Sequence, residues 1–424
     1  MTQTNNHNVP KLRFPEFSTD WNYAPIASVF DFYPTNSLSR NDLEDNWEGI
    51  LNIHYGDIHT RLPSRLDTTS IYLPTVREEK YTVAERQTPV EVGDIIFADA
   101  SEDTNDIGKM IEITAVGDRK VVSGLHTIHA KPKSDKRPAG GFCTDLFKST
   151  RVRQAIIRES QGAKVLGLSS KKLGSISIYL PIQAEQKKIS DFLGAVDDKI
   201  AQLTKKKALF ENYKKGCTNK LLSQLIRFSD AQGGDFPDWE ERRLGDVVEI
   251  YDGTHQTPKY VTEGVPFYSV EHVTSNNFEK TKFIAEDVFE KENRRVKIET
   301  GDILLTRIGD IGTSRLIDWD VRASFYVSLA LIKSSIPNIG AFLSHYMGHD
   351  DFQRELWHRT IHVAFPRKIN LGEIGNCKIF LPHPNEQHKI SEFLSSVDIK
   401  INQVNQKLIH AQAFKKGLLQ QMFI

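Results

Sequence analysis

Two long stretches of the chain carry apolar residues at alternating spacings of three and four, and this pattern predicts two long helices. An average period of 3.5 residues over about five heptads is typical of a coiled coil. We therefore expect the two helices to pair with each other, rather than to lie separately as amphipathic helices on their own domains. The seam consists of Ile189, Leu193, Val196, Ile200, Leu203, Lys207, Phe210, Lys214, Cys217 and Leu221 in the first helix, and of Ile390, Leu394, Val397, Ile401, Val404, Leu408, Ala411, Lys415, Leu418 and Met422 in the second.

The two helices are copies of one element. Pro181–Ile200 reads PIQAEQKKISDFLGAVDDKI, and Pro382–Ile401, which lies 201 positions later, reads PHPNEQHKISEFLSSVDIKI. Twelve of the twenty positions are identical, and the match resumes without a gap at Tyr213–Gly216 and Phe414–Gly417. An internal repeat of this length fixes the architecture, so we expect two related halves with one long helix each. The lysines on the seam are expected to weaken the pairing and to fix its register.

Short segments rich in β-branched and aromatic residues, bounded by Gly, Asp or Pro, predict strands on both sides of the first helix. The predicted strands are 49–53, 90–97, 110–116, 126–130 and 175–180 in the first half, and 247–251, 265–270, 302–307, 314–318 and 377–381 in the second. Helices are expected at 141–160 and 339–359. The dipeptides Gly93-Asp94 and Gly301-Asp302 each precede a strand, at an offset of 208 rather than 201. The two globular parts are therefore expected to be related but to differ in their loops.

The fold class is α+β, with two related α/β globular domains joined by two long helices that form an antiparallel coiled coil. We expect an N-terminal lead-in over 1–21, a first domain over 22–180 (head 1), a first helix over 181–226, a second domain over 227–381 (head 2) and a second helix over 382–424. Residues 1 to about 10 are polar and are expected to be disordered.

Each head opens with a similar lead-in. Arg13-Phe14 is followed by Asp20-Trp21, and Arg227-Phe228 is followed by Asp238-Trp239. If the helices are antiparallel, the N-terminal lead-in supplies the segment that would follow the C-terminus, and the chain is nearly circular with a pseudo-twofold axis. A helix of about 40 residues is about 60 Å long, so the pair could hold two heads at a fixed separation.

Composition limits the classes of function. Lys plus Arg equals Asp plus Glu, so the net charge is zero, and any nucleic-acid surface must be a local patch. The three cysteines are far apart in sequence, which indicates neither a disulfide framework nor a zinc site. No apolar run approaches eighteen residues, and we expect a cytoplasmic protein without membrane contact.

The duplicated helix, the two differing heads and the lead-ins together resemble the specificity (S, HsdS) subunit of type I restriction–modification systems. Tyr251–Tyr260 adds YDGTHQTPKY, a string frequent in the target-recognition domains of that family. The resemblance covers residues 10–424. It implies that each head reads one half of a split DNA site and that the paired helices set the unread spacer and dock two modification subunits. It also implies that restriction subunits join the complex.

According to the resemblance, the chain itself binds no cofactor. S-adenosylmethionine, used to methylate adenine, and ATP and Mg are expected in the partner subunits. The residues expected at the subunit-docking coiled coil are Glu185, Gln186, Phe192, Leu193, Val196 and Ile200 in the first helix, and Glu386, Gln387, Phe393, Leu394, Val397 and Ile401 in the second.

Reading bases requires side-chain donors and amides on positioned loops, and phosphate contacts require Lys, Arg and backbone N–H groups. The residues that meet this description in head 1 are Tyr55, His59, Arg61, Arg65 and Ser101, and those in head 2 are His255, Gln256, Thr257, Lys259, Tyr260, Arg307, Arg367 and Lys368. For any one of them, an ordinary solvated side chain is an equal alternative. Ala98–Ser101 stands where head 2 has Thr306–Gly309, which predicts different half-sites and an asymmetric target.

No catalytic or metal site is expected. Gly162 and Gly167 have the spacing of a phosphate-binding loop, but Leu168 occupies the position of the required lysine. The histidine pairs at 345/349 and 358/362 lack the glutamate of a zinc hydrolase motif. Two rival interpretations are a solitary nuclease or methyltransferase, and a two-headed scaffold that binds proteins.

Overall fold

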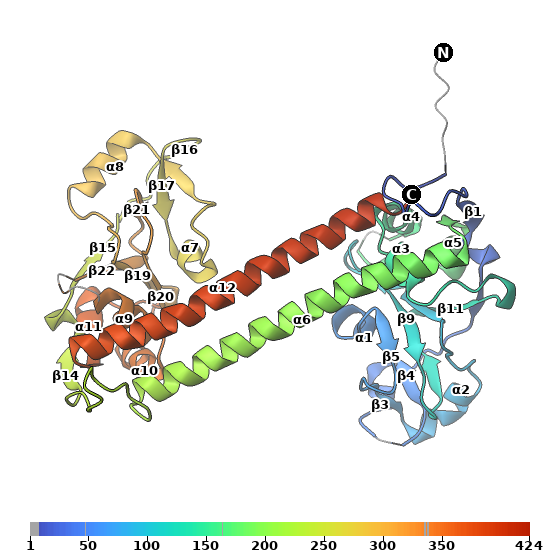
Figure 1. The fold of residues 1–424 in the computed structure, drawn as a ribbon, viewed down its shortest axis with the longest axis horizontal. Coiled ribbons are helices and arrows are strands. Elements are labelled where there is room, and N and C mark those ends of the chain that lie inside the picture. Colours follow the sequence, from blue (N-terminus) through green and yellow to red (C-terminus); the bar gives the residue numbers. More distant parts are fainter. Residues whose placement is uncertain (1–7, 47, 163, 335, 337–338) are drawn as a thin grey trace, which may run out of the picture. The chain divides into compact units, whose positions relative to one another are not determined.

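The computed structural model describes residues 8–424 except 47, 163, 335 and 337–338. The first seven residues, where disorder was expected, lie outside this described part. The chain divides into unit 1, which is Met1–Thr204 with Gln406–Ile424, and unit 2, which is Lys205–Asn405. The helices α6 (Gln183–Leu222) and α12 (Pro384–Gln421) are long and unbroken (Figure 1), and each crosses the boundary between the units. Each unit therefore contains the start of one helix and the end of the other.

Unit 1 has two main sheets. The five-stranded sheet has the order β2 (Phe30–Tyr33), β11 (Thr127–Pro132), β7 (Ile95–Ala98), β9 (Met110–Ala115) and β5 (Arg65–Asp67). The four-stranded sheet has the order β10 (Val121–Ser123), β4 (Leu51–Ile53), β6 (Thr75–Val76) and β3 (Leu43–Glu44). Two small ladders pair β1 (Asn22–Pro25) with β13 (Ser177–Leu180) and β8 (Ala100–Ser101) with β12 (Leu166–Gly167).

Unit 2 has two four-stranded sheets with matching orders. One runs β15 (Glu249–Asp252), β22 (Leu329–Lys333), β19 (Ile303–Ile308) and β20 (Asp310–Leu316). The other runs β16 (Tyr260–Val261), β18 (Lys282–Ile284), β17 (Val265–Tyr268) and β21 (Ser324–Phe325), and a ladder pairs β14 (Glu240–Arg243) with β23 (Lys378–Leu381). The strand orders of the two heads correspond element by element. The sheet of head 1 that contains β4 and the sheet of head 2 that contains β17 each include one parallel pair. The predicted relationship of the heads is therefore confirmed, and β5 is an addition in head 1.

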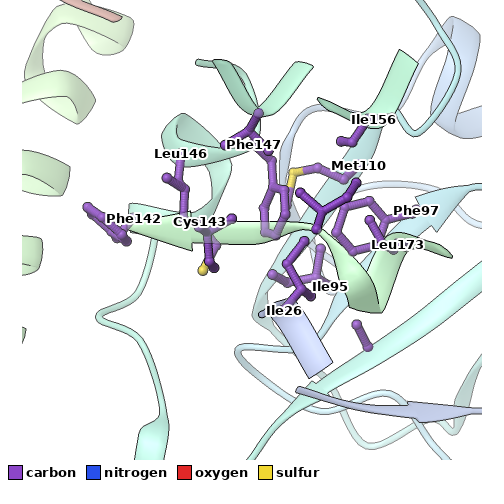
Figure 2. Close-up of a cluster of buried hydrophobic side chains, with 14 of the residues drawn as sticks. Ile26, Ile95, Phe97, Met110, Phe142, Cys143, Leu146, Phe147, Ile156 and Leu173 are labelled. Atoms are coloured by element: carbon purple, nitrogen blue, oxygen red, sulfur yellow. The ribbon is translucent and has the colours of Figure 1, made fainter. Parts of the chain in front are cut away.

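Alternation along the central strands divides each head into two cores. In β7, Ile95 and Phe97 face the helices, whereas Ile96 and Ala98 face a core shared with β4. Figure 2 shows the helix-side core, in which Ile95 and Phe97 lie beside side chains of α3 (Phe142–Leu146) and α4 (Thr150–Glu159). The central strand β19 of head 2 alternates in the same way between its two cores. Each sheet is thus a rigid layer that positions the loops at its edges.

The helix-side core of each unit includes both long helices. In unit 1, Leu193 of α6 and Leu418 of α12 are buried in one cluster with the head. In unit 2, Leu221 of α6 and Leu394 of α12 are buried in the other. The start of one helix therefore packs beside the end of the other, which is the antiparallel pairing that the seam predicted. Every seam position is buried or half-buried, whereas the flanking positions are mostly exposed.

Two predicted helices are each broken into two. The stretch 141–160 forms α3 and α4, and the stretch 339–359 forms α9 (Ile339–Tyr346) and α10 (Asp350–Arg359). The breaks lie at Ser149 and His349, which adopt extended backbone angles before the second helix of each pair. His349 also accepts a hydrogen bond from the N–H of Asp351, and acidic residues follow in the first turn. These are helix-start signals, and they override the continuous apolar pattern.

The predicted strand 90–97 is also too long, because its first half is a turn. Gly93 has a φ of +88°, and the Asp94 carboxylate accepts a hydrogen bond from the N–H of Glu91 at 2.9 Å. Head 2 repeats this turn, with Gly301 at φ +98° and Asp302 accepting from the N–H of Glu299 at 2.7 Å. The predicted match between the two Gly-Asp dipeptides is therefore confirmed in three dimensions. The remaining predicted strands are present, with ends shifted by a few residues.

Candidate nucleic-acid interface

Five of the predicted DNA-contacting residues lie together in head 2, four of them in the loop between β15 and β16 and Tyr260 at the first position of β16. The loop leaves the sheet at Gly253, where an added Cβ would lie 2.1 Å from the carbonyl oxygen of Phe325, so that only glycine fits. The Thr254 N–H donates to that same carbonyl at 3.0 Å. The side chains that follow are exposed to solvent, namely His255, Gln256, Thr257, Lys259 and Tyr260. The loop is therefore fixed at its root and free at its tip.

The charges on this loop are partly neutralised at its base. The Asp252 carboxylate accepts from Arg295 at 2.5 Å and contacts the His255 ring at 2.6 Å. Burial raises the pKa of Asp252, but the hydrogen bonds from Arg295 and His255 outweigh burial and leave this pKa below its ordinary value. Lys259 has no acidic partner among the described residues, and Lys282 lies 4.8 Å from the centre of the Tyr260 ring. The tip therefore presents cations and amides, which suit phosphates and base edges.

Arg307 is placed differently from the prediction. Its side chain is nearly fully buried, and it donates to the carbonyls of Val327 at 2.8 Å and Ile369 at 3.2 Å. Burial lowers the pKa of this guanidinium. We therefore correct its role from a DNA contact to a positioning residue that ties β19 to the segment before Ile369.

Arg367 and Lys368 lie on a second exposed loop of head 2, Ile361–Lys368. Its ends are joined by the N–H of Ile361, which donates to the carbonyl of Lys368 at 2.8 Å. The N–H of Gly309 donates to the carbonyl of Arg367 at 2.8 Å, so the loop is attached beside the end of β19. Both basic side chains are exposed, as the prediction requires.

In head 1, Tyr55 and His59 lie on the short helix α1 (Tyr55–Thr60), which follows β4. The His59 ring nitrogen contacts the carbonyl of Ala100 at 3.0 Å, and the Tyr55 ring lies 5.2 Å from that of His126. Ser101 is on β8, directly beside this contact. The structure therefore brings Tyr55, His59 and Ser101 together, at the position where head 2 has α7 (Val270–Ser275) and the end of β19.

Arg61 and Arg65 do not join that group. The Arg61 guanidinium is exposed but bonds to Asp57 at 2.9 Å and to the carbonyl of Tyr72 at 2.6 Å. Arg65 donates to Asp145 at 3.0 Å and lies 3.4 Å from the Ser190 hydroxyl of α6. We therefore correct the role of Arg65 from a DNA contact to a residue that joins head 1 to α6, because its guanidinium is paired inside unit 1.

Sequence reasoning missed several residues at these loops. In head 1, His126 contacts Asp99 at 3.1 Å, and both line a groove of about 570 Å³ that also includes Lys172. In head 2, Trp357 and Phe365 are exposed beside Arg367. His126 has a φ of +53°, and no sequence signal would have separated it from an ordinary strand residue. Phe365 carried a weak signal, because it is an aromatic residue shortly before the basic pair Arg367-Lys368.

Some of the residues expected to dock a modification subunit are internal. Glu185 and Glu386 are fully buried, and each accepts hydrogen bonds from an arginine and a tryptophan of its lead-in. Arg13 donates to Glu185 at 2.7 Å and the indole of Trp21 at 3.3 Å, and Arg227 donates to Glu386 at 2.7 and 3.0 Å and the indole of Trp239 at 3.1 Å. These two carboxylates therefore anchor the lead-ins and do not face a partner.

Gln186 and Gln387 are internal as well, since each donates from its amide to the proline carbonyl five residues earlier at 2.8 Å. Of the apolar residues expected there, Leu193, Leu394 and Val397 are buried and belong to the seam. Among these expected residues only Phe192 is classed as exposed, and its ring packs edge-on against Phe14 at 5.8 Å. Val196, Ile200, Phe393 and Ile401 are half-buried, and their docking role stays a prediction.

Two of the three seam lysines pair across the helices, whereas the third, Lys207, lies 3.8 Å from Glu211 of its own helix. In unit 1, Lys415 of α12 contacts Asp197 of α6 at 2.6 Å, and in unit 2, Lys214 of α6 contacts Asp398 of α12 at 2.7 Å. The two pairs are related by the 201-residue repeat, since Asp197 corresponds to Asp398 and Lys214 to Lys415. These contacts support the predicted role of the lysines in fixing register.

Among the described residues, no helix is long and apolar enough to cross a membrane. The same part of the chain holds no group of three or more His, Cys, Asp or Glu side chains arranged to bind a metal ion.

Comparison with known proteins gives consistent relatives. The type I restriction enzyme MjaVIII specificity subunit of Methanocaldococcus jannaschii is 28% identical over 268 residues, covering 60% of this chain and 63% of that protein. The EcoKI specificity subunit of Escherichia coli K12 is 21% identical over 315 residues, covering 69% of this chain and 66% of that protein. The chain thus spans a little under two thirds of the curated relatives that it matches.

A solved structure of the type I restriction–modification S subunit from M. genitalium has the same fold, with a TM-score of 0.61 at 15% identity and coverage of 98% of this chain and 99% of that one. A chain from a type I restriction–modification assembly has a TM-score of 0.55 at 14% identity, covering 95% and 97% of the two chains. Residues 20–211 and 237–411 each match the type I restriction modification DNA specificity domain. The chain therefore belongs to the family of type I restriction–modification DNA specificity proteins.

Proposed function

We propose that this chain is the DNA sequence-recognition subunit of a type I restriction–modification complex and has no catalytic centre of its own. Each head binds one half of a split, asymmetric site in double-stranded DNA. The observation that carries this proposal is that two heads of one topology present different side chains at corresponding loops. Tyr55 and His59 on α1 of head 1 stand where head 2 has Val270–Ser275 of α7, and Ala98–Ser101 stands where head 2 has Thr306–Gly309.

The long helices supply the second part of the proposal. They set the spacer between the two half-sites and dock two modification subunits, and restriction subunits join that complex in the cytoplasm. S-adenosylmethionine, ATP and Mg are bound by these partners and not by this chain. The exposed apolar side chains on the helices support docking, because exposed apolar area on a helix face is typical of a partner surface. They include Leu209, Tyr213, Ile399, Ile409 and Phe414.

The test is co-expression of the chain with its modification subunit, followed by genome-wide mapping of methylated adenine. The proposal expects a split, asymmetric motif with a fixed spacer, which disappears when this chain is deleted. If deletion leaves the motif unchanged, the chain is not the specificity subunit. A complex that forms without any DNA preference would instead favour a two-headed scaffold that binds proteins.

A further inference from the structure

The loop Ile361–Lys368 of head 2 presents apolar side chains to solvent. Phe365 and Val363 are 104% and 96% exposed, the two highest values among the exposed large hydrophobic residues of the described chain. Neither side chain packs in a core cluster of head 2. Folding therefore gains nothing from burying them, and both side chains are free to contact a ligand.

The stem that carries these side chains is firmly held. Lys368 bridges both Ile361 and Ile308, and Ile369 donates from its N–H to the carbonyl of Arg307 at 3.0 Å. The buried Arg307 guanidinium returns a hydrogen bond to the carbonyl of Ile369 at 3.2 Å. A tip held on such a stem loses little conformational freedom on binding, and this preorganisation favours affinity.

A second set of contacts orients the flanks of the tip. The His362 ring lies 4.2 Å from the Trp357 ring and contacts the Trp357 carbonyl at 2.9 Å. The Arg367 guanidinium lies over the Trp357 ring, 5.5 Å from its centre. Arg367 and Lys368 remain exposed and make no ion pair among the described residues. The apolar tip is therefore flanked by two free positive charges.

The corresponding loop of head 1 is built differently. It also closes by a bridge, between Gln161 and Gly167, beside the ladder of β8 and β12. Leu166 and Gly167 stand where head 2 has the two basic residues, and Val165 is half exposed. The combination of a fully exposed aromatic tip and flanking cations thus occurs in head 2 only, as far as the described residues show.

We infer that Ile361–Lys368 is a DNA-inserting element, in which Phe365 enters the base stack beside the half-site bound by head 2 while Arg367 and Lys368 hold the flanking phosphates. The inference rests on the proposed function. An apolar wedge between base pairs unstacks a step and kinks the duplex, and nearby cations compensate the phosphates. Two exposed cations beside an apolar tip complement phosphates on both sides of an unstacked base step, so the charge favours DNA.

The experiment uses the full chain purified with its modification subunit, and duplexes that contain the mapped methylation motif. One duplex at a time carries 2-aminopurine at a position in the head 2 half other than the methylated adenine, and its fluorescence rises when the base is unstacked. Wild type is expected to raise fluorescence at one step. Phe365→Ala is expected to abolish most of this rise and to weaken binding about tenfold, since stacking on an aromatic ring contributes about 1–3 kcal/mol per base.

Three further variants separate the roles. Phe365→Leu retains part of the fluorescence rise, because leucine also forms a wedge. Arg367→Ala keeps the rise but makes binding less dependent on salt, by about one unit of slope. Leu225→Ala, which truncates another highly exposed apolar residue, matches wild type in both measurements.

The two possible failures differ in which protein shows them. If wild type itself binds the duplexes without dependence on salt or sequence, the proposed function fails and the inference fails with it. If wild type binds specifically but Phe365→Ala has the same affinity and the same fluorescence, only the inference is overturned. It is also overturned if Phe365→Ala loses the modification subunit while DNA binding by the remaining complex is unchanged, because the tip is then a protein contact.

Discussion

The two places where a long helix begins share one anchor and differ in what surrounds it. In both units a buried glutamate of the helix's first turn accepts hydrogen bonds from the arginine and the tryptophan of a lead-in. One lead-in follows α6 directly along the chain. The other begins at the N-terminus, and the Leu12 N–H donates to the carbonyl of Gln421 at 2.9 Å, so it meets the end of α12 without a peptide bond. The duplication thus keeps the geometry of the anchor while its covalent connection changes.

The surroundings of the seam lysines are where the units differ. In unit 1, Lys415 also contacts the buried Asp145 at 3.4 Å, and Arg65 contacts the same carboxylate. In unit 2, the corresponding environment of Lys214 contains His345, whose ring nitrogen lies 3.4 Å from the Ser395 hydroxyl. One unit therefore joins head to helix through buried charge, and the other through a neutral imidazole. Equivalent backbones can thus be held by different electrostatics, and the two should respond differently to mutation and pH.

The largest expected effect tests the shared feature. Glu185→Ala and Glu386→Ala each leave an arginine and an indole N–H without their buried partner, so each should lower the free energy of unfolding of its unit by about 3–5 kcal/mol. Glu211→Ala removes an exposed carboxylate on α6 and should lower the free energy of unfolding by less than about 0.5 kcal/mol. Urea unfolding measures all three. A small loss in only one of the two anchor variants would show that the anchors are not equivalent.

The next prediction concerns the seam lysines. Lys415→Met leaves Asp145 buried with Arg65 alone, and we expect a loss of about 3 kcal/mol in unfolding free energy. Lys214→Met breaks a pair whose aspartate, Asp398, is 37% exposed, so the loss should stay below about 1 kcal/mol. The two substitutions are matched in chemistry and in repeat position. Equal losses would contradict the claim that buried charge distinguishes unit 1.

Acidification should change the stability contributions of His345 in unit 2 and Asp145 in unit 1 in opposite directions. Burial and the nearby Lys214 lower the pKa of His345 to about 4 in the folded state. Between the unfolded value near 6.5 and about pH 4 the unfolded chain binds the proton and the folded chain does not, so unit 2 loses stability as pH falls through this window. We expect a loss of about 2 kcal/mol, discounted for the partial exposure of the ring.

Asp145 has the opposite sign. Burial raises its pKa in the folded state above 3.8, although Lys415 and Arg65 act against this. The folded chain then binds the proton before the unfolded chain does, so this group adds stability as pH falls through its raised pKa. His345→Gln should flatten the acid loss of unit 2, and Asp145→Asn should remove the gain of unit 1. Thermal unfolding of each variant beside wild type at pH 7, 5.5 and 4.5 measures both, and a change of the same sign in the two variants would contradict the assignment.

The smallest expected effect concerns DNA binding by the loop between β15 and β16 of head 2. Lys259→Ala removes one exposed cation, and we expect DNA affinity to fall about fivefold and the salt slope to decrease by about one, with stability unchanged. Lys199→Ala, on the exposed face of α6, is the matched control and should change neither. An effect on stability alone would place Lys259 in the fold and not on DNA.

Much of this architecture could be predicted because its signals are local or periodic. The seam, the repeat and the paired Gly-Asp turns lie within short windows of sequence. The sequence shows Arg13 and Glu185 as members of repeated motifs, but it does not show that they are hydrogen-bonded to each other, because they are 172 positions apart and nothing local connects them. Arg65 and Arg307 resemble DNA contacts in sequence, since both are basic residues beside a strand, but tertiary packing turns them inward. The exposed loops were predicted as groups, and their individual contacts remain to be measured.

The central claim is that each head reads its own half-site. The most direct measurement replaces residues 22–180 with a second copy of residues 240–381, co-expresses this chain with the modification subunit, and maps methylated adenine across the genome. The account predicts a split motif with the original spacer in which both halves carry the bases of the head 2 half-site. An unchanged asymmetric motif, or a change in both halves at once, would contradict it.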